Sequence, residues 1–365
     1  MQVTKSLYFR LVSLLFVLSL ILSAGFCTLT VIADTLIGSE AELFFNPAHA
    51  LAIQNRINNE PDEPGLLAPI LDNDRIGGLF NLNPSLEEAQ AGLNNLLAYA
   101  KTLDLSTYPD EYAANVMHAI NRAGRLDNSS TATDINVARL RLQVAVDTLK
   151  VDLQSVDSSQ LQSMVRQGAL RYVELTQMYL TRIELYDFNT IKINSVLALN
   201  PDALKIAAEK DAMVAENPSL ATGIFGLTVL VKDNIGTVGS DGMATTAGSV
   251  ALRHNYAPFD ATQITNVKEA GGIILGKVNL SEFANFTATG NPSTASRNFY
   301  LQRYGVPYPH PGNVPSGHSS WGGQVLSPYR YDLMARGWPL MNPSGSSSGS
   351  GSAAAAALCT FTIGT

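Results

Sequence analysis

The sequence predicts an α/β domain over residues 152–365, preceded by a helical region over residues 34–151. From residue 152 onward, segments with apolar residues at helical spacing alternate with short apolar runs, which is typical of helices layered on a sheet. The preceding region is rich in Leu, Ala and Asn and keeps helical spacing. With 46% hydrophobic and 15% charged residues, a chain of 365 residues can bury a sizeable core.

The first 33 residues are predicted to be a secretory signal peptide. Lys5 and Arg10 precede an uncharged, Leu-rich run from Leu11 to Ala33, and small residues near its end offer cleavage positions. A helix that crosses a bilayer needs about 20 apolar residues, so a retained membrane anchor over residues 11–33 is the alternative. We therefore expect a secreted or extracytoplasmic protein that meets a membrane only if this segment is retained.

Charge and cysteine content exclude several classes of partner and cofactor. The formal net charge of -7 and the pI near 5.3 argue against nucleic acid as the main partner, because phosphate binding needs a basic face. The two cysteines, Cys27 and Cys359, cannot build a disulfide framework or a Cys-based metal site, since Cys27 lies inside the apolar run. We expect no metal and no cofactor.

The helical region contains two amphipathic stretches. Asn83 is expected to cap the first helix, with Pro84 at its first position. No catalytic constellation is evident between residues 34 and 151, so we expect the chemistry in the second half. The apolar residues at helical spacing are Leu86, Ala89, Leu93 and Leu97 in the first stretch and Ala138, Leu142, Ala145 and Leu149 in the second.

Three helices are expected next. The first two carry apolar residues around Leu161 and from Tyr172 to Ile183, with Gly168 ending the first. The third begins at Asn200 as a cap, has Pro201 at its first position, and runs to about residue 216.

Short apolar runs then predict strands at residues 227–231 and 273–275, with a helix over 262–270 between them. Residues 287–343 are rich in Pro, Gly, Ser and Tyr and predict a long irregular segment. An Ala-rich helix over 352–358 and a β segment over 361–363 complete the pattern.

Lys232 is the first candidate for chemistry. It directly follows the apolar run 227–231, and a lysine at the end of a buried strand loses hydration. Desolvation lowers the pKa of an amine toward the range of a general base. A lysine that closes a strand can also be an ordinary solvated end residue, so the pattern alone leaves both interpretations open.

The Ser/Gly run at residues 345–352 is the second candidate. It leads into an alanine run and so places hydroxyl and N–H groups at the start of a helix, where negative charge is stabilised. A flexible linker is one alternative. A nucleophile elbow centred on Ser347 is another, but it needs an acidic residue and a histidine later in the chain, and neither follows Ser347 here.

Several segments of the second half resemble the amidase-signature family in order and spacing. The resemblance covers roughly residues 152–365, because the helices before the first strand match as well. It implies a mixed sheet sandwiched by helices and a hydrolase of carbon-nitrogen bonds that acts on a small-molecule amide. The matching segments are residues 226–235, 245–249, 260–261, 270–282 and the Ser/Gly run.

The resemblance also implies roles for two residues. The family uses a Ser-Ser-Lys triad, and Lys232 stands at the position of its lysine. Alignment on Gly345 places Ser346 where the family has a serine after a cis peptide bond, which relays a proton between lysine and nucleophile. A slip of one residue would assign that role to Ser347. The pair Gly364-Thr365 matches the Gly-Thr that opens the family's nucleophile segment.

The family's attacking serine and oxyanion-hole glycines lie a few residues beyond that pair, so we expect them outside residues 1–365 and the domain to be incomplete at its C-terminus. One hypothesis is an amidase whose nucleophile is missing from this chain. The alternatives are a catalytically inactive, exported amidase-like binding protein and a membrane-anchored interaction protein that acts through residues 34–151. His310 and His318 lie in or near the irregular segment and are interpreted as structural.

Overall fold

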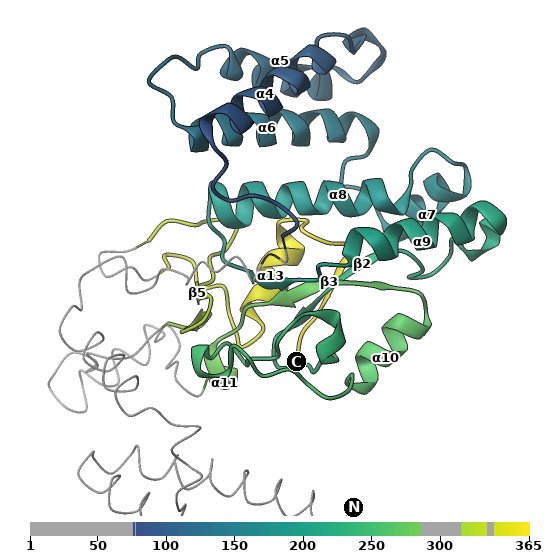
Figure 1. The fold of residues 1–365 in the computed structure, drawn as a ribbon, viewed down its shortest axis with the longest axis vertical. Coiled ribbons are helices and arrows are strands. Elements are labelled where there is room, and N and C mark those ends of the chain that lie inside the picture. The colour runs from purple at the N-terminus through teal and green to yellow at the C-terminus, as the bar shows by residue number, and fades with distance from the viewer. Residues whose placement is uncertain (1–75, 77, 286–314, 334–338) are drawn as a thin grey trace, which may run out of the picture. The chain divides into compact units, whose positions relative to one another are not determined.

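The computed structural model describes residues 76, 78–285, 315–333 and 339–365 (Figure 1). The predicted signal peptide or anchor and His310 lie outside these residues. Among the helices that are described, none combines the length and the apolar character that a membrane span requires.

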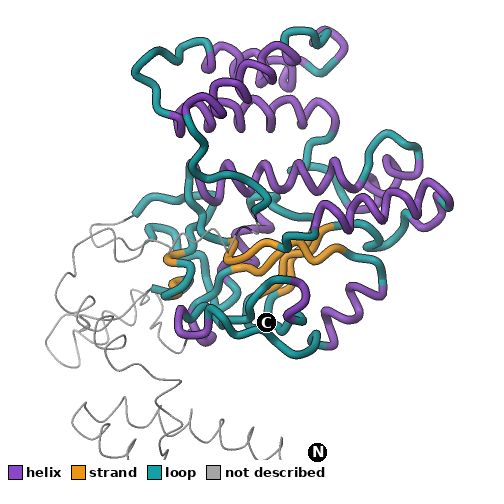
Figure 2. The backbone as a smooth tube through the Cα atoms, viewed as in Figure 1, coloured by secondary structure: helices purple, strands orange, loops and turns teal. Residues whose placement is uncertain are grey.

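A mixed sheet lies at the centre of the second half (Figures 1 and 2). Its strands run in the order β1-β3-β2-β6. β2 is parallel to both of its neighbours, and β1 is antiparallel to β3. The strands are β1 (Val196–Leu199), β2 (Thr228–Lys232), β3 (Ile273–Val278) and β6 (Phe361–Ile363), and a separate pair joins β4 (His318–Ser319) to β5 (Gly323–Gln324).

Helices cover both faces of this sheet, which confirms the predicted class. Along β2, Val229 and Val231 face a small core shared with Ile264 of α10, whereas Leu230 faces the larger core. This alternation is the period-two pattern of a strand buried on both sides. One face is covered by α10 (Thr262–Glu269), and the other by α7 (Ser158–Arg166), α8 (Tyr172–Arg182), α9 (Ala203–Glu216) and α13 (Ser348–Ala355).

The helical region forms a bundle of α4 (Leu86–Ala100), α5 (Asp110–Ala123) and α6 (Ala132–Lys150), with apolar clusters between the helices. The prediction that Asn83 caps the first helix of this region is wrong. Ser85 caps α4 instead, because its Oγ accepts the N–H of Glu88 while the Glu88 carboxylate accepts the N–H of Ser85. This reciprocal pair satisfies two terminal donors at once, which Asn83 cannot do.

Helix α6 connects the bundle to the α/β domain through polar contacts with α8 and the segment after it. Asn136 Nδ2 donates to Glu184 Oε1 at 3.1 Å, and Arg139 Nη2 lies 3.4 Å from the same oxygen. Lys150 Nζ pairs with Glu174 Oε2 at 2.8 Å. Glu184 is buried, so this contact is shielded from solvent.

Two predicted helix starts also differ from the structure. α9 begins at Ala203 because the Asn200 side chain accepts the N–H of Asp202 and donates to the Ile274 carbonyl, which ties it to β3. α13 begins at Ser348, a turn earlier than the predicted residue 352. Neither β1 nor the π-helical turn η6 (Ile183–Asn189) was predicted. The other short elements are η5 (Leu105–Thr107), η7 (Pro218–Leu220), η8 (Gly239–Asp241), η9 (Val250–Leu252) and α11 (Glu282–Asn285).

Candidate active site

Lys232 ends β2, and its side chain is fully buried. Its Nζ donates to Ser346 Oγ at 2.7 Å and to Thr365 Oγ1 at 2.7 Å. Burial lowers the pKa of the Lys232 amine from its usual value. The structure therefore brings the two candidates from sequence, 114 positions apart, into direct hydrogen-bond contact.

Ser346 lies in the turn that enters α13. The peptide bond between Gly345 and Ser346 is cis. The Ser346 carbonyl accepts the N–H of Ser281 at 3.1 Å, which fixes the turn against the segment after β3. A Cβ on Gly345 would lie 2.3 Å from Ser316 Oγ and 2.6 Å from Ser281 Oγ, so only glycine fits at this position.

Ser347 has a different partner from Ser346. Its Oγ donates to the Thr365 carbonyl at 2.9 Å and accepts the Thr365 N–H at 3.1 Å. A Cβ on Gly364 would lie 2.9 Å from the same Oγ, so the chain passes Ser347 at close range. Ser346 is thus the serine that forms a hydrogen bond with the Lys232 amine, whereas Ser347 forms hydrogen bonds with the backbone of Thr365.

Arg182 holds the opposite end of α13. Its buried guanidinium donates from Nη2 to the Ala356 carbonyl at 2.7 Å and from Nε to the Ala357 carbonyl at 2.8 Å. These carbonyls belong to the C-cap residue of α13 and the residue after it, and a cation at the C-terminus of a helix satisfies free acceptors and complements the helix dipole. The sequence showed Arg182 only within a matching helix, and no local pattern pointed to a contact 174 positions away.

Burial shifts the pKa of two further side chains considered from sequence, His318 and Cys359. His318 belongs to β4, and burial lowers its pKa to about 4, so its ring is neutral near pH 7. Burial raises the pKa of the Cys359 thiol to about 12, which disfavours the reactive thiolate. Over the residues that the structure describes, no group of at least three His, Cys, Asp or Glu side chains is placed to hold a metal ion.

Comparisons with known proteins identify the family. The family model named Amidase matches residues 174–365. A putative amidase of Schizosaccharomyces pombe is 32% identical over 216 residues, which is 59% of this chain and 30% of that protein. A chloroplastic/mitochondrial glutamyl-tRNA(Gln) amidotransferase subunit from Vitis vinifera is 40% identical over 133 residues, which is 34% of this chain and 23% of that protein.

Among solved structures, the native peptide amidase from Stenotrophomonas maltophilia is 35% identical, with 57% of this chain and 35% of that chain covered and a TM-score of 0.44. An amidase family protein from Bacillus anthracis is 30% identical, with coverages of 68% and 40% and a TM-score of 0.49. The chain spans less than a third of the length of the curated relatives described above. Because the family model matches more than half of the chain, across the segment that contains Lys232 and Ser346, this chain belongs to the amidase family.

Proposed function

We propose that the protein hydrolyses the carbon-nitrogen bond of a small-molecule amide, with Lys232 as the base and Ser346 as a proton bridge. The observation that carries the proposal is the 2.7 Å hydrogen bond between the buried Lys232 amine and Ser346 Oγ. Membership of the amidase family supports the reaction class. The nucleophile in this proposal is a serine outside residues 1–365.

The proposed chemistry begins with a neutral Lys232 amine. The amine takes the proton of Ser346 Oγ while Ser346 takes the proton of the attacking serine, whose oxygen then forms a bond to the carbonyl carbon of the amide. The proton returns along the same path to the nitrogen of the leaving group, and the carbon-nitrogen bond breaks. Water then cleaves the acyl-enzyme by the same relay. Burial of Lys232 suits this role, because desolvation favours the neutral amine.

We also propose that the protein acts outside the cytoplasm. The basis is the apolar run over residues 11–33 with basic residues before it. N-terminal sequencing of the secreted product checks this proposal: a mature N-terminus near residue 34 is expected, and retention of residue 11 in a membrane fraction supports the anchor instead.

The test of the reaction compares the 365-residue chain with the same chain extended at its C-terminus by the residues that follow in the gene. A fluorophosphonate probe that labels activated serines, together with ammonia release from primary amides, reports activity. We expect the extended protein to label, and K232A and S346A to lower its labelling rate by about 100-fold or more, as for loss of a general base.

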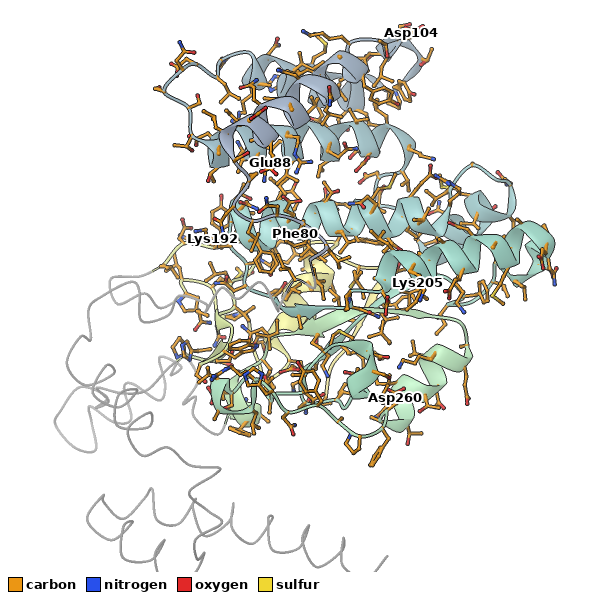
Figure 3. All side chains as sticks on the ribbon, in the orientation of Figure 1. Phe80, Glu88, Asp104, Lys192, Lys205 and Asp260 are labelled. Carbon is orange, nitrogen blue, oxygen red and sulfur yellow. The ribbon has the colours of Figure 1, made fainter. Side chains whose placement is uncertain are left out.

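Exposed residues of the same types provide the matched controls. Lys205 of α9, labelled in Figure 3, and Ser219 of η7 are both exposed, so K205A and S219A should leave the labelling rate unchanged. Labelling that survives both K232A and S346A would contradict the proposed relay. An extended protein that binds amides in calorimetry but is never labelled would replace it with the binding-protein alternative.

A further inference from the structure

A second lysine forms a buried ion pair directly behind the proposed relay. Lys277 Nζ on β3 lies 3.7 Å from Asp233 Oδ1, and Asp233 follows Lys232 in the chain. The two side chains are 0% and 1% exposed. Neither residue has a part in the proton relay, so the presence of two buried charges beside it requires an explanation.

Each member of this pair has partners that favour its charged form. Asp233 Oδ2 accepts the N–H of Thr246 at 3.0 Å, the Thr246 hydroxyl, and the N–H of Gly248 at 3.4 Å. Lys277 Nζ donates to the Ile235 carbonyl and to Thr245 Oγ1. The donors all bind Oδ2, and Oδ1, which accepts no hydrogen bond, has the Lys277 ammonium at 3.7 Å as its nearby charge, which is the arrangement of an ion pair.

The pair lies on the opposite face of the sheet from the relay. Lys277 is in register with Val231, whose side chain faces the α10 core, whereas Lys232 faces Ser346 at the start of α13. Consecutive residues of a strand point to opposite faces. Asp233 and Lys277 therefore act on Lys232 through the strand, without touching its amine.

The charges of this pair bear on the protonation of Lys232. An isolated carboxylate next to the end of β2 would favour the protonated amine, and an isolated ammonium would disfavour it. Burial raises the pKa of Asp233 and lowers the pKa of Lys277, while the charge of each residue favours the ionised form of the other. Together they present almost no net charge to Lys232.

We propose that Asp233 and Lys277 are positioning residues that hold the end of β2 in place while cancelling each other's charge, so that Lys232 remains a neutral base. The role of Lys232 as a base rests on the proposed function. The effect of Asp233 and Lys277 on the protonation of the Lys232 amine can be measured without it.

The remaining charged groups near the pair belong to one surface cluster. Asp241 at the end of η8 and Asp260 just before α10 act on Lys277, and both pair with Lys268 of α10, at 2.7 and 2.8 Å. Asp260 is visible just before α10 in Figure 3. Lys268 offsets only one of these two carboxylates, but the side chains of this cluster are partly exposed, so solvent screens its remaining negative charge more than it screens the buried charges of Asp233 and Lys277.

The test measures the titration midpoint of the Lys232 amine in the 365-residue chain by its Cε carbon NMR shift, assigned with K232R. D233N leaves the Lys277 cation alone and should lower the midpoint. K277M leaves the Asp233 anion alone and should raise it. Each change should be on the order of one pH unit, the size expected for one unpaired buried charge on the other side of the strand at an effective dielectric constant of about 20.

The variants that preserve neutrality should restore the wild-type midpoint. These are K277R, which retains the cation, and the double variant D233N/K277M, which removes both charges. K150M, which breaks the exposed ion pair between Lys150 of α6 and Glu174 of α8, is the remote control and should have no effect. The proposal would be overturned if the single variants D233N and K277M left the Lys232 midpoint unchanged, or if both shifted it in the same direction.

Loss of folding is also informative. If a single variant does not fold, the double variant decides, because it removes both buried charges: it should fold and titrate as the wild type does. A double variant that is unfolded, or whose midpoint is displaced, would show a packing role only. These results do not need the nucleophile, so they stand even if the extended protein is never labelled and the proposed hydrolysis fails.

Discussion

At the scale of single residues, the site depends on one amine that has been removed from water. Lys232 is buried because β2 is covered on both faces, and its Nζ has two hydroxyl groups as partners at 2.7 Å and the Thr365 carbonyl oxygen at 3.4 Å. Removal from water disfavours the charged ammonium and lowers the pKa of the Lys232 amine. The neutral amine that a general base requires is therefore favoured by the fold itself.

This burial predicts the pH dependence of activity. The labelling rate of the extended protein should rise with pH as Lys232 loses its proton, with a midpoint below the ordinary lysine value of 10.5. Because the unfolded chain binds that proton more strongly, stability should also rise with pH through the same window. Labelling rates measured from pH 5 to 11 check the first statement, and a rate that falls across this range would contradict it.

The close packing around Gly345 predicts that a larger side chain at this position destabilises the fold. G345A should lower the free energy of unfolding by about 2 to 3 kcal/mol, because its new methyl group would overlap Ser316 Oγ and Ser281 Oγ. Gly351 of α13 has no atom within 4 Å of the corresponding position, so G351A is the matched control and should stabilise the helix by about 0.5 to 1 kcal/mol. Urea unfolding measures both, and equal effects would contradict the assigned packing.

At the scale of elements, helix ends are set by short reciprocal contacts. S85A should destabilise α4 by about 1 kcal/mol, since the N–H of Glu88 loses its acceptor. Asn83, the cap expected from sequence, donates its own N–H to Asn81 Oδ1 and gives the control. N83A should change stability by less than about 0.5 kcal/mol. A larger loss for N83A than for S85A in urea unfolding would reverse this assignment.

Helix α6 contains a carboxylate whose pKa is raised. Burial raises the pKa of Asp147 to about 6, against opposing contributions from the Gln143 hydrogen bond and Lys150. The folded state thus binds this proton more tightly than the unfolded state, so Asp147 becomes less destabilising as the pH falls from about 6 toward 4. The neutral variant D147N should gain about 1 kcal/mol at pH 7, after allowance for partial exposure of the group.

Thermal unfolding of both proteins at pH 4, 5, 6 and 7 checks this prediction. The difference between D147N and the wild type should shrink as the pH is lowered. A difference that is constant across the series would show that Asp147 is not the titrating group.

The elements also show what sequence could and could not predict. The sequence predicted strand β2, helix α10 and strand β6, because the local pattern of apolar residues in these segments favours the same element that the surrounding structure stabilises. β1 was missed because Val196–Leu199 is a short apolar run with no strand period, and it becomes a strand by pairing with β3. α13 starts early because Gly349 donates its N–H to the Asn279 carbonyl, a distant contact that offsets the poor helix propensity of Ser and Gly.

The site shows the same limit. Lys232 stood out locally because an apolar run precedes it, but nothing in the local pattern joined it to Ser346. That link came from resemblance to a family. Asp233, Lys277 and Arg182 were all present in the matching segments, yet their roles depend on contacts between strands and helices that spacing along the chain does not encode.

At the scale of the whole molecule, the helical bundle contacts the α/β domain through contacts of unequal strength. E184A should cost about 1 to 3 kcal/mol, because it leaves the buried Asn136 amide without its acceptor. E174A removes an exposed ion pair with Lys150 and should cost less than about 1 kcal/mol. Urea unfolding of both variants compares them, and similar losses would mean that burial does not decide the strength of this interface.

The Arg182 contact has a consequence for how distant changes are felt. Because its guanidinium binds the two carbonyls that follow α13, a residue of α8 restrains the C-terminal end of a short helix that begins two residues after Ser346. Loss of these hydrogen bonds would allow α13 to move. The Ser346 hydroxyl would then move away from the Lys232 amine, although neither of these two residues had been altered. A substitution in α8 can in this way change the contact between Lys232 and Ser346 from a distance.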